Sequence, residues 1–442
     1  MSTWINEGGA DREISSRETN TCLKGVADAL PAGLKKILLI PPDFSRFHSG
    51  AGEICSQLYF LLAKRAAIEF LPALGTHRPM TATEITQMFP GVPHDLIRIH
   101  DWQKGLTPMG AIPGERLREL SGGKVDYPVS IEIDQLIALG KHDVIISCGQ
   151  IVPHEVVGMA GGNKNILVGC AGPDTINKSH FLGAVCNMES IMGHIESPVR
   201  TLLNEAEDGL LARLPLMYIL TVRAKNDQGR LVTRGLFAGN DRESYLRAAR
   251  LSQQVNIVKT PRLKKVVVYL DPGEFKSTWL GNKAIYRTRM ALADNSELLI
   301  LAPGLVEFGE AEINERMIRR YGYRGTPATL RAVAEDAELR NSLGAAAHLI
   351  HGSSEGRFTI TYAPGGLSRA DIEGVGFRYA DLKSALARYN PEKLEDGFNT
   401  LPDGEEIYYI SNPALGLWQA EEELRNADCG LRNEECRMKS DT

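Results

Sequence analysis

Short apolar runs with the residue types of buried β-strands alternate along this chain with stretches of helical periodicity. In the first half these runs are "KKILLIPP" (35–42), "IEFLPALGTH" (68–77) and "HDVIISCGQ" (142–150). In the second half they are "LKKVVVYLDPG" (263–273), "SELLILAPGL" (296–305) and "RFTITYAPGG" (357–366). Such alternation is typical of parallel sheets covered by helices, so the sequence predicts an α/β fold with mainly parallel sheets.

The chain length indicates more than one domain, because 442 residues exceed the usual size of a single hydrophobic core. A long helical pattern at 241–255 links the two series of strands. We therefore expect an N-terminal α/β domain over 1–258 and a C-terminal α/β domain over 259–442. Ligands in such folds gather at the carboxyl ends of strands, which predicts an active-site cleft between the two domains.

Less regular patterns predict the remaining elements. Strands are expected at 95–102 and 125–134, and the tail after Trp418 has the pattern of a solvated helix. The other helices are expected at 282–293, 310–320, 327–349 and 380–389.

The composition limits the partners and the compartment. A net charge of −5 provides no basic field for phosphates, which argues against a nucleic-acid partner. The apolar runs are too short to cross a bilayer, and the amino end lacks the pattern of a signal peptide, so no membrane partner is expected. Seven scattered cysteines, Cys429 and Cys436 among them, favour free thiols in a reducing cytoplasm.

Polar side chains follow three of the predicted strands of the first domain. Asp43 and Arg46 come after the first strand, His77 and Arg78 after the second, and His154 after the strand at 143–149. Because parallel strands deliver their carboxyl ends to one edge of a sheet, this convergence predicts an active site.

Each of these residues also has a structural interpretation. Asp43 is suited to brace a turn, but a hydrogen-bonding role is equally open to it, and Arg46 is suited to bind a carboxylate or phosphate. His77 lies between a Gly-Thr turn and Pro79, which fixes an imidazole as a general acid or base needs. Arg78 is expected to be solvated.

The stretch "PHEVVGMAGGNKNILVGCAGPDTINKSH" (153–180) concentrates two histidines and a lysine in a glycine-rich segment. A zinc-protease motif is excluded because the second histidine of H-E-x-x-H is missing, and the Walker spacing is missing too. From the residues alone, Lys164 remains open between a surface lysine, a phosphate ligand and a covalent anchor. His180 remains open between a structural imidazole and a metal ligand.

Together, "PPDFSRFHS" (41–49), "LGTHRPM" (74–80) and this glycine-rich stretch resemble the nickel-pincer lactate racemase family, whose members racemise or epimerise 2-hydroxyacids. The resemblance is strong over about residues 35–200. It is most specific at the glycine-rich stretch, where histidine, lysine and histidine recur with the spacing of the family.

The resemblance implies a tethered cofactor, pyridinium-3,5-bisthiocarboxylic acid mononucleotide carrying nickel. By this resemblance Lys164 is the covalent anchor through a thioamide, and His180 is the protein ligand of a square-planar Ni(II). His77 and His154 are then the two acid/base catalysts. The cofactor-binding residues expected beside them are Asp43, Arg46, Gly161 and Gly162. The implied partners are a small 2-hydroxyacid and the enzymes that build and load the pincer.

The C-terminal domain departs from the family pattern. Tyr286 matches the tyrosine of the family, Arg287 stands where glutamine is usual, and Met290 stands where a lysine is expected. The tryptophan of the family is replaced within "ELRNSLGAAAHLIHG" (338–352). The predicted substrate-binding residues are Arg46, Tyr286, Arg287, His348 and His351, with Arg289 and Ser353 as further polar groups. This polar set suits a sugar acid such as an aldonate better than lactate, because arginine is the better carboxylate clamp.

Two other classes of function remain open. A zinc hydrolase or lyase would use His77, His154 and His180 as metal ligands, with Asp43 or Glu155 as base, but it would leave Lys164 without a role. An inactive hydroxyacid- or nucleotide-binding protein would not require both acid/base histidines.

Overall fold

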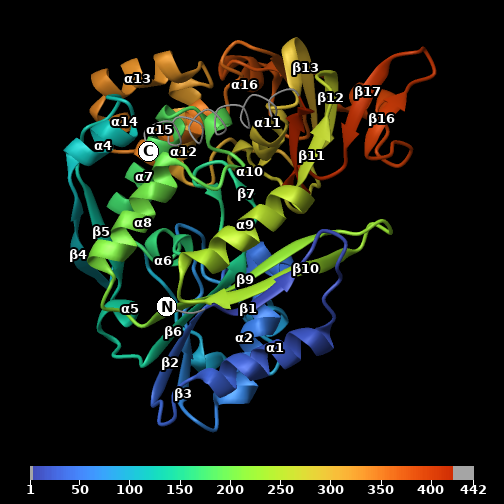
Figure 1. Ribbon diagram of the computed structural model, residues 1–442. Coiled ribbons are helices and arrows are strands. Elements are labelled where there is room, and N and C mark those ends of the chain that lie inside the picture. Colours follow the sequence, from blue (N-terminus) through green and yellow to red (C-terminus); the bar gives the residue numbers. More distant parts are fainter. Residues whose placement is uncertain (1–2, 422–442) are drawn as a thin grey trace, which may run out of the picture. The chain divides into compact units, whose positions relative to one another are not determined.

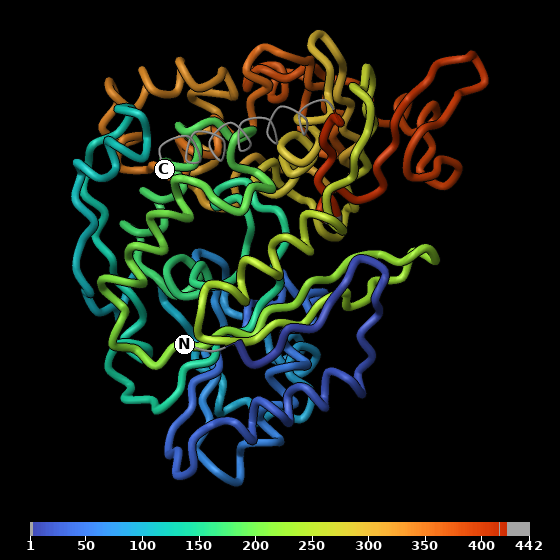
Figure 2. Tube along the Cα trace, in the orientation of Figure 1, coloured from blue at the N-terminus to red at the C-terminus, as the bar shows by residue number. Residues whose placement is uncertain are grey.

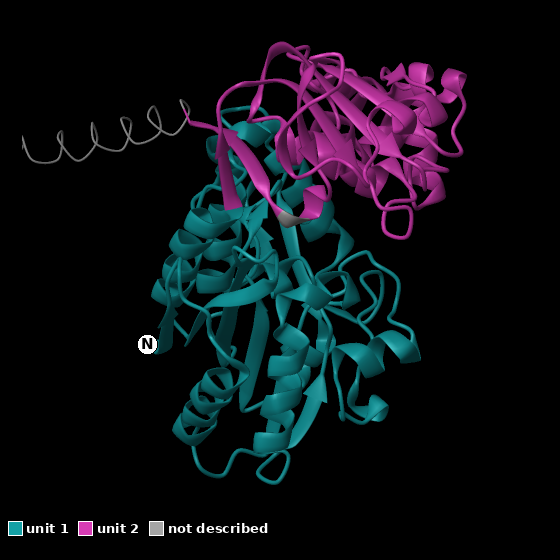
Figure 3. Ribbon diagram, turned by 90° about the vertical axis from the view of Figure 1, so that its right-hand side faces the viewer, with its two compact units in different colours: residues 1–256 teal, residues 257–442 magenta. Residues whose placement is uncertain are grey.

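The computed structural model describes residues 3–421. The chain divides into two compact units, Met1–Asn256 and Ile257–Thr442, coloured separately in Figure 3. The predicted boundary after residue 258 lies two residues beyond this division. Residues 422–442 of the predicted helical tail, with Cys429 and Cys436, lie outside the described residues.

Unit 1 contains a six-stranded mixed sheet with the strand order β1-β10-β9-β6-β2-β3 (Figure 1). Strands β9, β6, β2 and β3 run parallel, whereas β10 pairs antiparallel with both β9 and β1. The tube in Figure 2 shows the N-terminal strand lying beside β10, far away in the sequence. The strands are β1 (Thr3–Gly8), β2 (Lys36–Ile40), β3 (Ala67–Phe70), β6 (Val144–Gln150), β9 (Leu216–Lys225) and β10 (Leu231–Gly239).

Helices cover both faces of this sheet. Helices α1 (Ser16–Ala29) and α2 (Ala51–Leu62) cover one face, where Ile37 and Leu39 of β2 and Ile146 of β6 join one hydrophobic core. Helix α9 (Arg242–Asn256) lies against β9, β10 and β1 on the other face (Figure 1). The central strands are apolar on both faces because both are covered, as expected for parallel strands.

The part of unit 1 that follows β3 is built from short elements. A hairpin of β4 (Leu106–Ile112) and β5 (Val129–Asp134) contacts α7 (Pro173–Val185) and α8 (Pro198–Leu210). A two-residue pair, β7 (Pro153–His154) and β8 (Gly158–Met159), leads into α6 (Lys164–Leu167). The remaining helical segments are η1 (Phe44–Ser49), α3 (Ala82–Met88), η2 (His94–Leu96), α4 (Gly114–Leu120), α5 (Gln135–Leu139) and η3 (Met188–Ser190).

Unit 2 has its own six-stranded sheet, with the order β15-β14-β13-β12-β17-β16, parallel except for β16. A second core lies against it, around Tyr389 and Tyr409. The strands are β11 (Ile257–Thr260), β12 (Leu263–Tyr269), β13 (Leu292–Ala302), β14 (Thr359–Pro364), β15 (Arg378–Tyr379), β16 (Gly397–Thr400), β17 (Glu406–Ile410) and β18 (Leu417–Ala420). The helices are α10 (Thr278–Gly281), α11 (Lys283–Thr288), α12 (Glu312–Tyr321), α13 (Thr326–Glu335), α14 (Ala337–Arg340), α15 (Leu343–His351), α16 (Arg369–Gly374), α17 (Leu382–Arg388) and η4 (Pro413–Leu415).

The predicted α/β class with mainly parallel sheets is confirmed, but three predicted elements are wrong. Residues 95–102 form no strand: Ile97 makes a single bridge to Phe70, and Ile99 is 64% exposed. The helix predicted at 282–293 ends at Thr288, because Leu292 already pairs with β12. The helix predicted at 327–349 is three helices.

Two features explain why the helix predicted at 327–349 is divided into three helices. Asp336 has extended backbone angles and caps α14 by accepting a hydrogen bond from the backbone N–H of Glu338, which is the usual role of aspartate at a helix start. Asn341 and Ser342 then separate α14 from α15.

Two further predictions concern the membrane and the thiols. Within residues 3–421, none of the helices combines the length and the apolar character needed to cross a bilayer. The five described cysteines are free thiols: Cys22, Cys55, Cys148, Cys170 and Cys186.

Candidate active site

A carboxylate and an imidazole pair at the carboxyl ends of β2 and β3. The His77 ring donates from Nδ1 to Asp43 Oδ2 at 2.7 Å, and the Ser45 hydroxyl donates to Asp43 Oδ1 at 2.6 Å. Burial alone would raise the pKa of Asp43, but the bonds from His77 and Ser45 and the charge of Arg46 lower it below its usual value. The ionised carboxylate can only accept, so His77 holds a proton on Nδ1 and presents Nε2 outward from the pair.

His154 has the opposite arrangement. It lies in β7, its side chain is buried, and its Nδ1 accepts a hydrogen bond from the backbone N–H of Val156 at 3.1 Å. The neutral ring therefore carries its proton on Nε2. Glu155 Oε2 lies 3.8 Å from the same Nδ1.

Lys164 is the first residue of α6 and is half-buried. Burial lowers the pKa of its amine to about 8, and the positive charges of Arg46 and Arg200 act in the same direction. The charges of Glu155 and Asp43 oppose this shift. At pH 7 roughly a tenth of the amine is thus unprotonated, far more than for an ordinary lysine, and this is the nucleophilic form.

His180 lies on α7 and donates from Nδ1 to the carbonyl oxygen of Ile176 at 2.7 Å. Burial, followed by the charge of Lys164, lowers the pKa of His180 to about 4. The ring is therefore neutral at pH 7, with its lone pair on Nε2. A neutral imidazole whose other nitrogen donates to a carbonyl is the form that binds metals in proteins.

The predicted residues of unit 1 come together in one cluster. The charge of Lys164 acts on His180, and the charges of Asp43 and Arg46 act on Lys164. Glu155, which the sequence suggested only for a zinc site, lies beside His154, and its charge acts on both Lys164 and His180. Residues from His77 to His180, which are 34 to 137 positions from Asp43 in the sequence, are therefore its neighbours in the fold. This is expected because the carboxyl ends of parallel strands meet at one edge of the sheet.

Gly161 and Gly162 have a structural reason to be glycine. Both have positive φ angles, 79° and 61°. A Cβ on Gly161 would lie 2.5 Å from Ile151 Cδ1, and one on Gly162 would lie 3.1 Å from the ring of Tyr245. Close packing and left-handed backbone angles thus account for both glycines, and their role in binding a cofactor stays a prediction.

Several residues around this glycine turn were missed by the sequence interpretation. Asn163, Arg200 and Tyr245 hold the turn through side-chain contacts. The only signal in the sequence is the spacing of Arg200, Asn204 and Glu207, which places all three on one face of a helix.

The predicted substrate residues of unit 2 lie on two helices and are buried. Tyr286 and Arg287 are on α11, and His348 and His351 are on α15. His348 Nε2 lies 3.0 Å from the hydroxyl oxygen of Tyr323, which links α15 to the segment that follows α12. The predicted cleft between the domains stays a prediction.

The other polar groups named for unit 2 have backbone partners. Arg289 donates to the carbonyl oxygen of Ser353 at 3.1 Å, and the Ser353 hydroxyl donates to Ile350 O at 3.0 Å. These bonds fasten the end of α15, so the structure gives Arg289 and Ser353 a supporting role.

The structure bears on the zinc alternative. Among residues 3–421, no three side chains of histidine, cysteine, aspartate or glutamate come together as a metal-binding group. His77, His154 and His180 therefore do not form the three-ligand site that a catalytic zinc requires.

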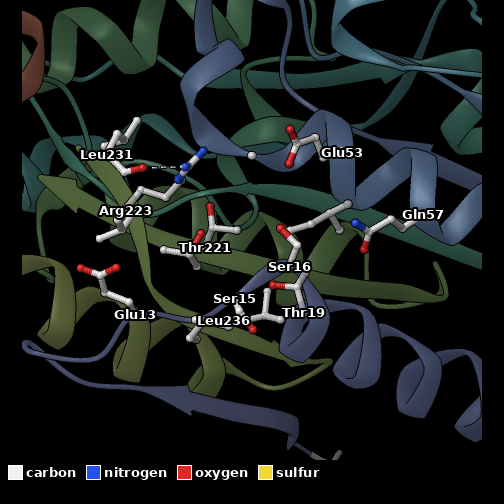
Figure 4. A pocket seen from close by; sticks show the side chains of 15 residues that line it. Glu13, Ser15, Ser16, Thr19, Glu53, Gln57, Thr221, Arg223, Leu231 and Leu236 are labelled. Carbon is white, nitrogen blue, oxygen red and sulfur yellow. Dashed lines mark hydrogen bonds between the residues drawn. The ribbon is translucent and has the colours of Figure 1, made fainter. Parts of the chain in front are cut away.

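A separate cavity of about 450 Å³ is lined mainly by residues of α1, α2, β9 and β10 (Figure 4). Arg223 projects into it and donates to His48 O at 3.0 Å and Leu231 O at 3.2 Å. The hydroxyl of Thr221 donates to Ser49 O at 2.8 Å. These bonds support η1, but none of the predicted site residues lines this cavity.

The fold and the cluster define a two-unit α/β protein with a candidate proton-transfer site, in which two imidazoles with opposite proton positions belong to the same cluster as a half-buried amine. The comparisons with known proteins agree with this class. The family model of the lactate racemase N-terminal domain matches residues 25–193, so this part of the chain is similar to that domain. The family resemblance predicted from the sequence is confirmed.

Similar proteins extend the comparison. A lactate racemase from Thermoanaerobacterium thermosaccharolyticum is 27% identical over 243 residues, which are 52% of this chain and 50% of that protein. The chain thus matches about half the length of this curated relative.

Two solved structures share the fold. A Thermotoga maritima protein superposes with a TM-score of 0.79 at 20% identity, over 94% of this chain and 100% of its own. The lactate racemase apoprotein from T. thermosaccharolyticum has a TM-score of 0.66 at 16% identity, over 93% of this chain and 91% of its own.

Proposed function

We propose that this protein is a racemase or epimerase of a 2-hydroxyacid that depends on a nickel-pincer nucleotide. One observation carries the proposal: Lys164, a lysine with a lowered pKa, lies within electrostatic range of His180, a neutral imidazole with its metal-binding nitrogen available. The match to the lactate racemase N-terminal domain supports the same class of reaction.

The residues present fit the proposed cofactor. Lys164 supplies an amine in the form that can be acylated, which a thioamide anchor requires. His180 supplies a single nitrogen ligand in a tautomer fixed by Ile176. Arg46, exposed and close enough to influence Lys164, is suited to an anionic group such as a phosphate or a substrate carboxylate. When bound, the nickel pincer would accept the Cα hydrogen of the substrate as hydride and return it.

The chain supplies the proton transfers. His77 Nε2 would accept the hydroxyl proton of one stereoisomer, while Asp43 stabilises the imidazolium that forms. His154, with its proton on Nε2, would donate a hydrogen bond to the substrate oxygen. To act as the base for the opposite stereoisomer, it would first exchange to the Nδ1–H tautomer through solvent, which gives up the bond from Val156 and frees Nε2 to accept the hydroxyl proton. Each such transfer contributes roughly 10²–10⁴-fold to a rate. Two imidazoles are required because the hydroxyl group of each stereoisomer faces a different side.

The substrate is proposed to be a sugar acid such as an aldonate. In this proposal Tyr286, Arg287, His348 and His351 of unit 2 bind its carboxylate and hydroxyl groups, together with Arg46. The replacement of the glutamine of the family by Arg287, and of its tryptophan within the segment 338–352 that carries His348 and His351, supports the proposal. A comparison of D-aldonates with lactate as substrates of the loaded protein tests it, and activity on lactate alone would refute the sugar-acid assignment.

The cofactor is tested first by mass. The protein is isolated from cells supplied with nickel and with the enzymes that build the pincer, and intact and peptide masses are measured. A covalent adduct on the Lys164 peptide, with nickel bound, is the expected result. The variant Lys164→Arg is the matched control, because it keeps the charge but cannot form the thioamide, and its adduct should be absent. Unmodified Lys164 in cells that load a known lactate racemase would contradict the proposal.

The remaining parts of the proposal concern partners and compartment. The enzymes that build and load the pincer are proposed as transient partners. A cytoplasmic location is supported by the free thiols of the five described cysteines, which are typical of a reducing compartment.

A further inference from the structure

Helix α8 presents three polar side chains to the turn that precedes Lys164. Arg200, Asn204 and Glu207 are spaced at i, i+4 and i+7 and therefore share one face of the helix. Figure 1 shows α6, which begins with Lys164, between α8 and α9. We call Arg200, Asn204 and Glu207 the α8 clamp.

Arg200 makes the most contacts with the turn. Its side chain is buried, at 3% exposure, and donates from Nη1 to Asn163 Oδ1 at 2.5 Å. Nη2 donates to the carbonyl oxygens of Met159 at 2.6 Å and Gly161 at 3.4 Å. Among the described residues Arg200 has no ion-pair partner, so these three oxygens are what compensates its buried charge.

The other two clamp residues hold the side chain of Asn163. The Nδ2 of Asn163 donates to Asn204 Oδ1 and to Glu207 Oε2, both at 2.9 Å. The second oxygen of Glu207 accepts a hydrogen bond from the hydroxyl of Tyr218 on β9. Asn163 immediately precedes Lys164, so the amide group of this one residue ties the start of α6 to α8.

Tyr245 of α9 closes the other side of the turn. The guanidinium carbon of Arg200 lies 4.4 Å from the centre of its ring, which is a favourable cation–π distance. The Tyr245 hydroxyl donates to the same Met159 oxygen at 3.1 Å. The Met159–Asn163 turn is thus held by two helices.

A buried guanidinium is costly, and an apolar side chain of similar size would stabilise a core at least as well. Its presence here requires a reason specific to the turn. The turn contains two left-handed glycines, and Arg200 donates to two of its backbone carbonyl oxygens, those of Met159 and Gly161.

From these contacts we propose that the α8 clamp, with Arg200 as its central positioning residue, fixes the Met159–Asn163 turn so that the amine of Lys164 is held where the cofactor is attached. The contacts of the clamp are seen in unit 1 itself, whereas its role in cofactor attachment rests on the proposed function.

The test compares Arg200→Met, Arg200→Lys and Arg234→Met with the unaltered full-length protein. Arg234 is a matched control, because it is also buried in unit 1 and donates to a backbone oxygen, that of Arg12, away from the turn. Hydrogen–deuterium exchange of the amides at 159–164 should become roughly tenfold faster in Arg200→Met, because the turn opens more often once Met159 O, Gly161 O and Asn163 Oδ1 lose the guanidinium that holds them. Arg200→Lys should be intermediate, since an ammonium group cannot reach all three oxygens. Arg234→Met should leave this segment unchanged.

A second readout is the fraction of Lys164 that carries the adduct in cells that load the pincer. We expect a decrease of roughly tenfold in Arg200→Met and none in Arg234→Met, because small displacements of a reacting group lower rates strongly. Unchanged exchange in folded Arg200→Met would overturn the clamp, and faster exchange with an undiminished adduct would overturn its role in attachment. If the unaltered protein carries no adduct, the proposed function fails and so does this link to attachment, while the exchange result still decides whether the clamp exists.

Discussion

At the scale of single residues, the chemistry of the Asp43–His77 pair depends on which ring nitrogen of His77 carries the proton. Asp43→Asn replaces an obligatory acceptor by an amide that can also donate to Nδ1, which would move the ring proton to Nε2. We expect conversion of the 2-hydroxyacid to fall by roughly 10²-fold or more, with little change in KM. Rates on the substrate identified by the aldonate–lactate comparison check this.

The control for this substitution is Asp126→Asn, because Asp126 is an exposed carboxylate that pairs with Arg118 away from the site. Nitrogen NMR of selectively labelled histidine gives an independent readout, in which the proton of His77 shifts from Nδ1 to Nε2 in Asp43→Asn. An unchanged tautomer together with an unchanged rate would show that Asp43 does not orient His77.

Lys164 allows a prediction that needs no cofactor. Its amine has a pKa of about 8 because burial and then the charges of Arg46 and Arg200 disfavour the ammonium form. The free amine should therefore be half-populated near pH 8, compared with about 10.4 for an ordinary lysine. Competitive acetylation across pH, read by peptide mass, measures this midpoint, with exposed Lys24 as internal reference. Equal midpoints for both lysines would contradict the lowered pKa.

At the scale of elements, two helical glycines make a matched pair. A Cβ on Gly25 of α1 would meet nothing within 4 Å, whereas one on Gly183 of α7 would lie 2.9 Å from Val156 O. Gly25→Ala should stabilise the protein by roughly 0.5–1 kcal/mol, since alanine loses less backbone entropy on folding. Gly183→Ala should destabilise it by roughly 1–3 kcal/mol, because α7 must move away from the residue that follows Glu155.

Urea denaturation of both alanine variants measures these changes in the free energy of unfolding. A destabilised Gly25→Ala or a neutral Gly183→Ala would contradict the packing seen around α1 and α7. Because Gly183 lies one turn after His180, its variant should also bind nickel more weakly if His180 is the ligand.

Strands β2 and β3 are joined by a charge network around Glu69 of β3. Its carboxylate lies 2.7 Å from Lys36 Nζ, 3.0 Å from Arg98 Nη2 and 3.2 Å from His142 Nε2. Burial would raise the pKa of Glu69, but these three partners lower it to about 2. A lowered carboxyl pKa stabilises the folded state above the unfolded pKa of about 4.3, and this contribution is lost as the pH falls toward 2.

The variant Glu69→Gln should therefore lower the free energy of unfolding at pH 7 by roughly 1 kcal/mol, after allowance for solvent screening. The difference from the unaltered protein should shrink between about pH 4 and pH 2. Glu119→Gln is the control, because Glu119 is exposed and pairs only at the surface. Urea titrations at several pH values make the measurement, and a pH-independent difference would refute the role of ionisation.

The elements that could be predicted from the sequence are those with one strong local signal. Continuous apolar runs predicted β2, β6, β12 and β14, because central parallel strands are buried on both faces. The hairpin of β9 and β10 was not predicted, and its pairing with the N-terminal strand depends on contacts between residues more than 220 positions apart.

The candidate site divides in the same way. Asp43, His77 and His154 could be predicted because each lies in the polar segment after a predicted strand, and Lys164 and His180 followed from the family resemblance. Arg200 and Glu155 could not be placed, because their importance comes from partners brought close by the fold: Arg200 is 37 residues from Asn163. Helical spacing shows which side chains share a face but not what that face meets.

At the scale of the whole molecule, the predicted functions divide between the two units. The residues proposed as acid/base histidines, anchor lysine and nickel ligand all belong to unit 1, which has its own core around β2 and β6. The predicted substrate residues of α11 and α15 belong to unit 2, which has a separate core around β12 and β17. Cofactor attachment and substrate specificity should therefore be separable by cutting the chain at the end of α9.

A protein of residues 1–256 tests this division. We expect it to fold cooperatively, because its sheet is covered on both faces by its own helices, and to carry both nickel and the Lys164 adduct when made in cells that load the pincer. It should not convert the hydroxyacid at a measurable rate, because the carboxylate and hydroxyl contacts proposed for Tyr286, Arg287, His348 and His351 are missing, and binding energy from remote groups is needed to position a substrate. Calorimetry, metal analysis and peptide mass make the comparison with the full chain, and Lys164→Arg in the same fragment is the control. An unfolded fragment would show that the units depend on each other for stability, and a fragment that converts substrate at the full rate would remove unit 2 from the proposed mechanism.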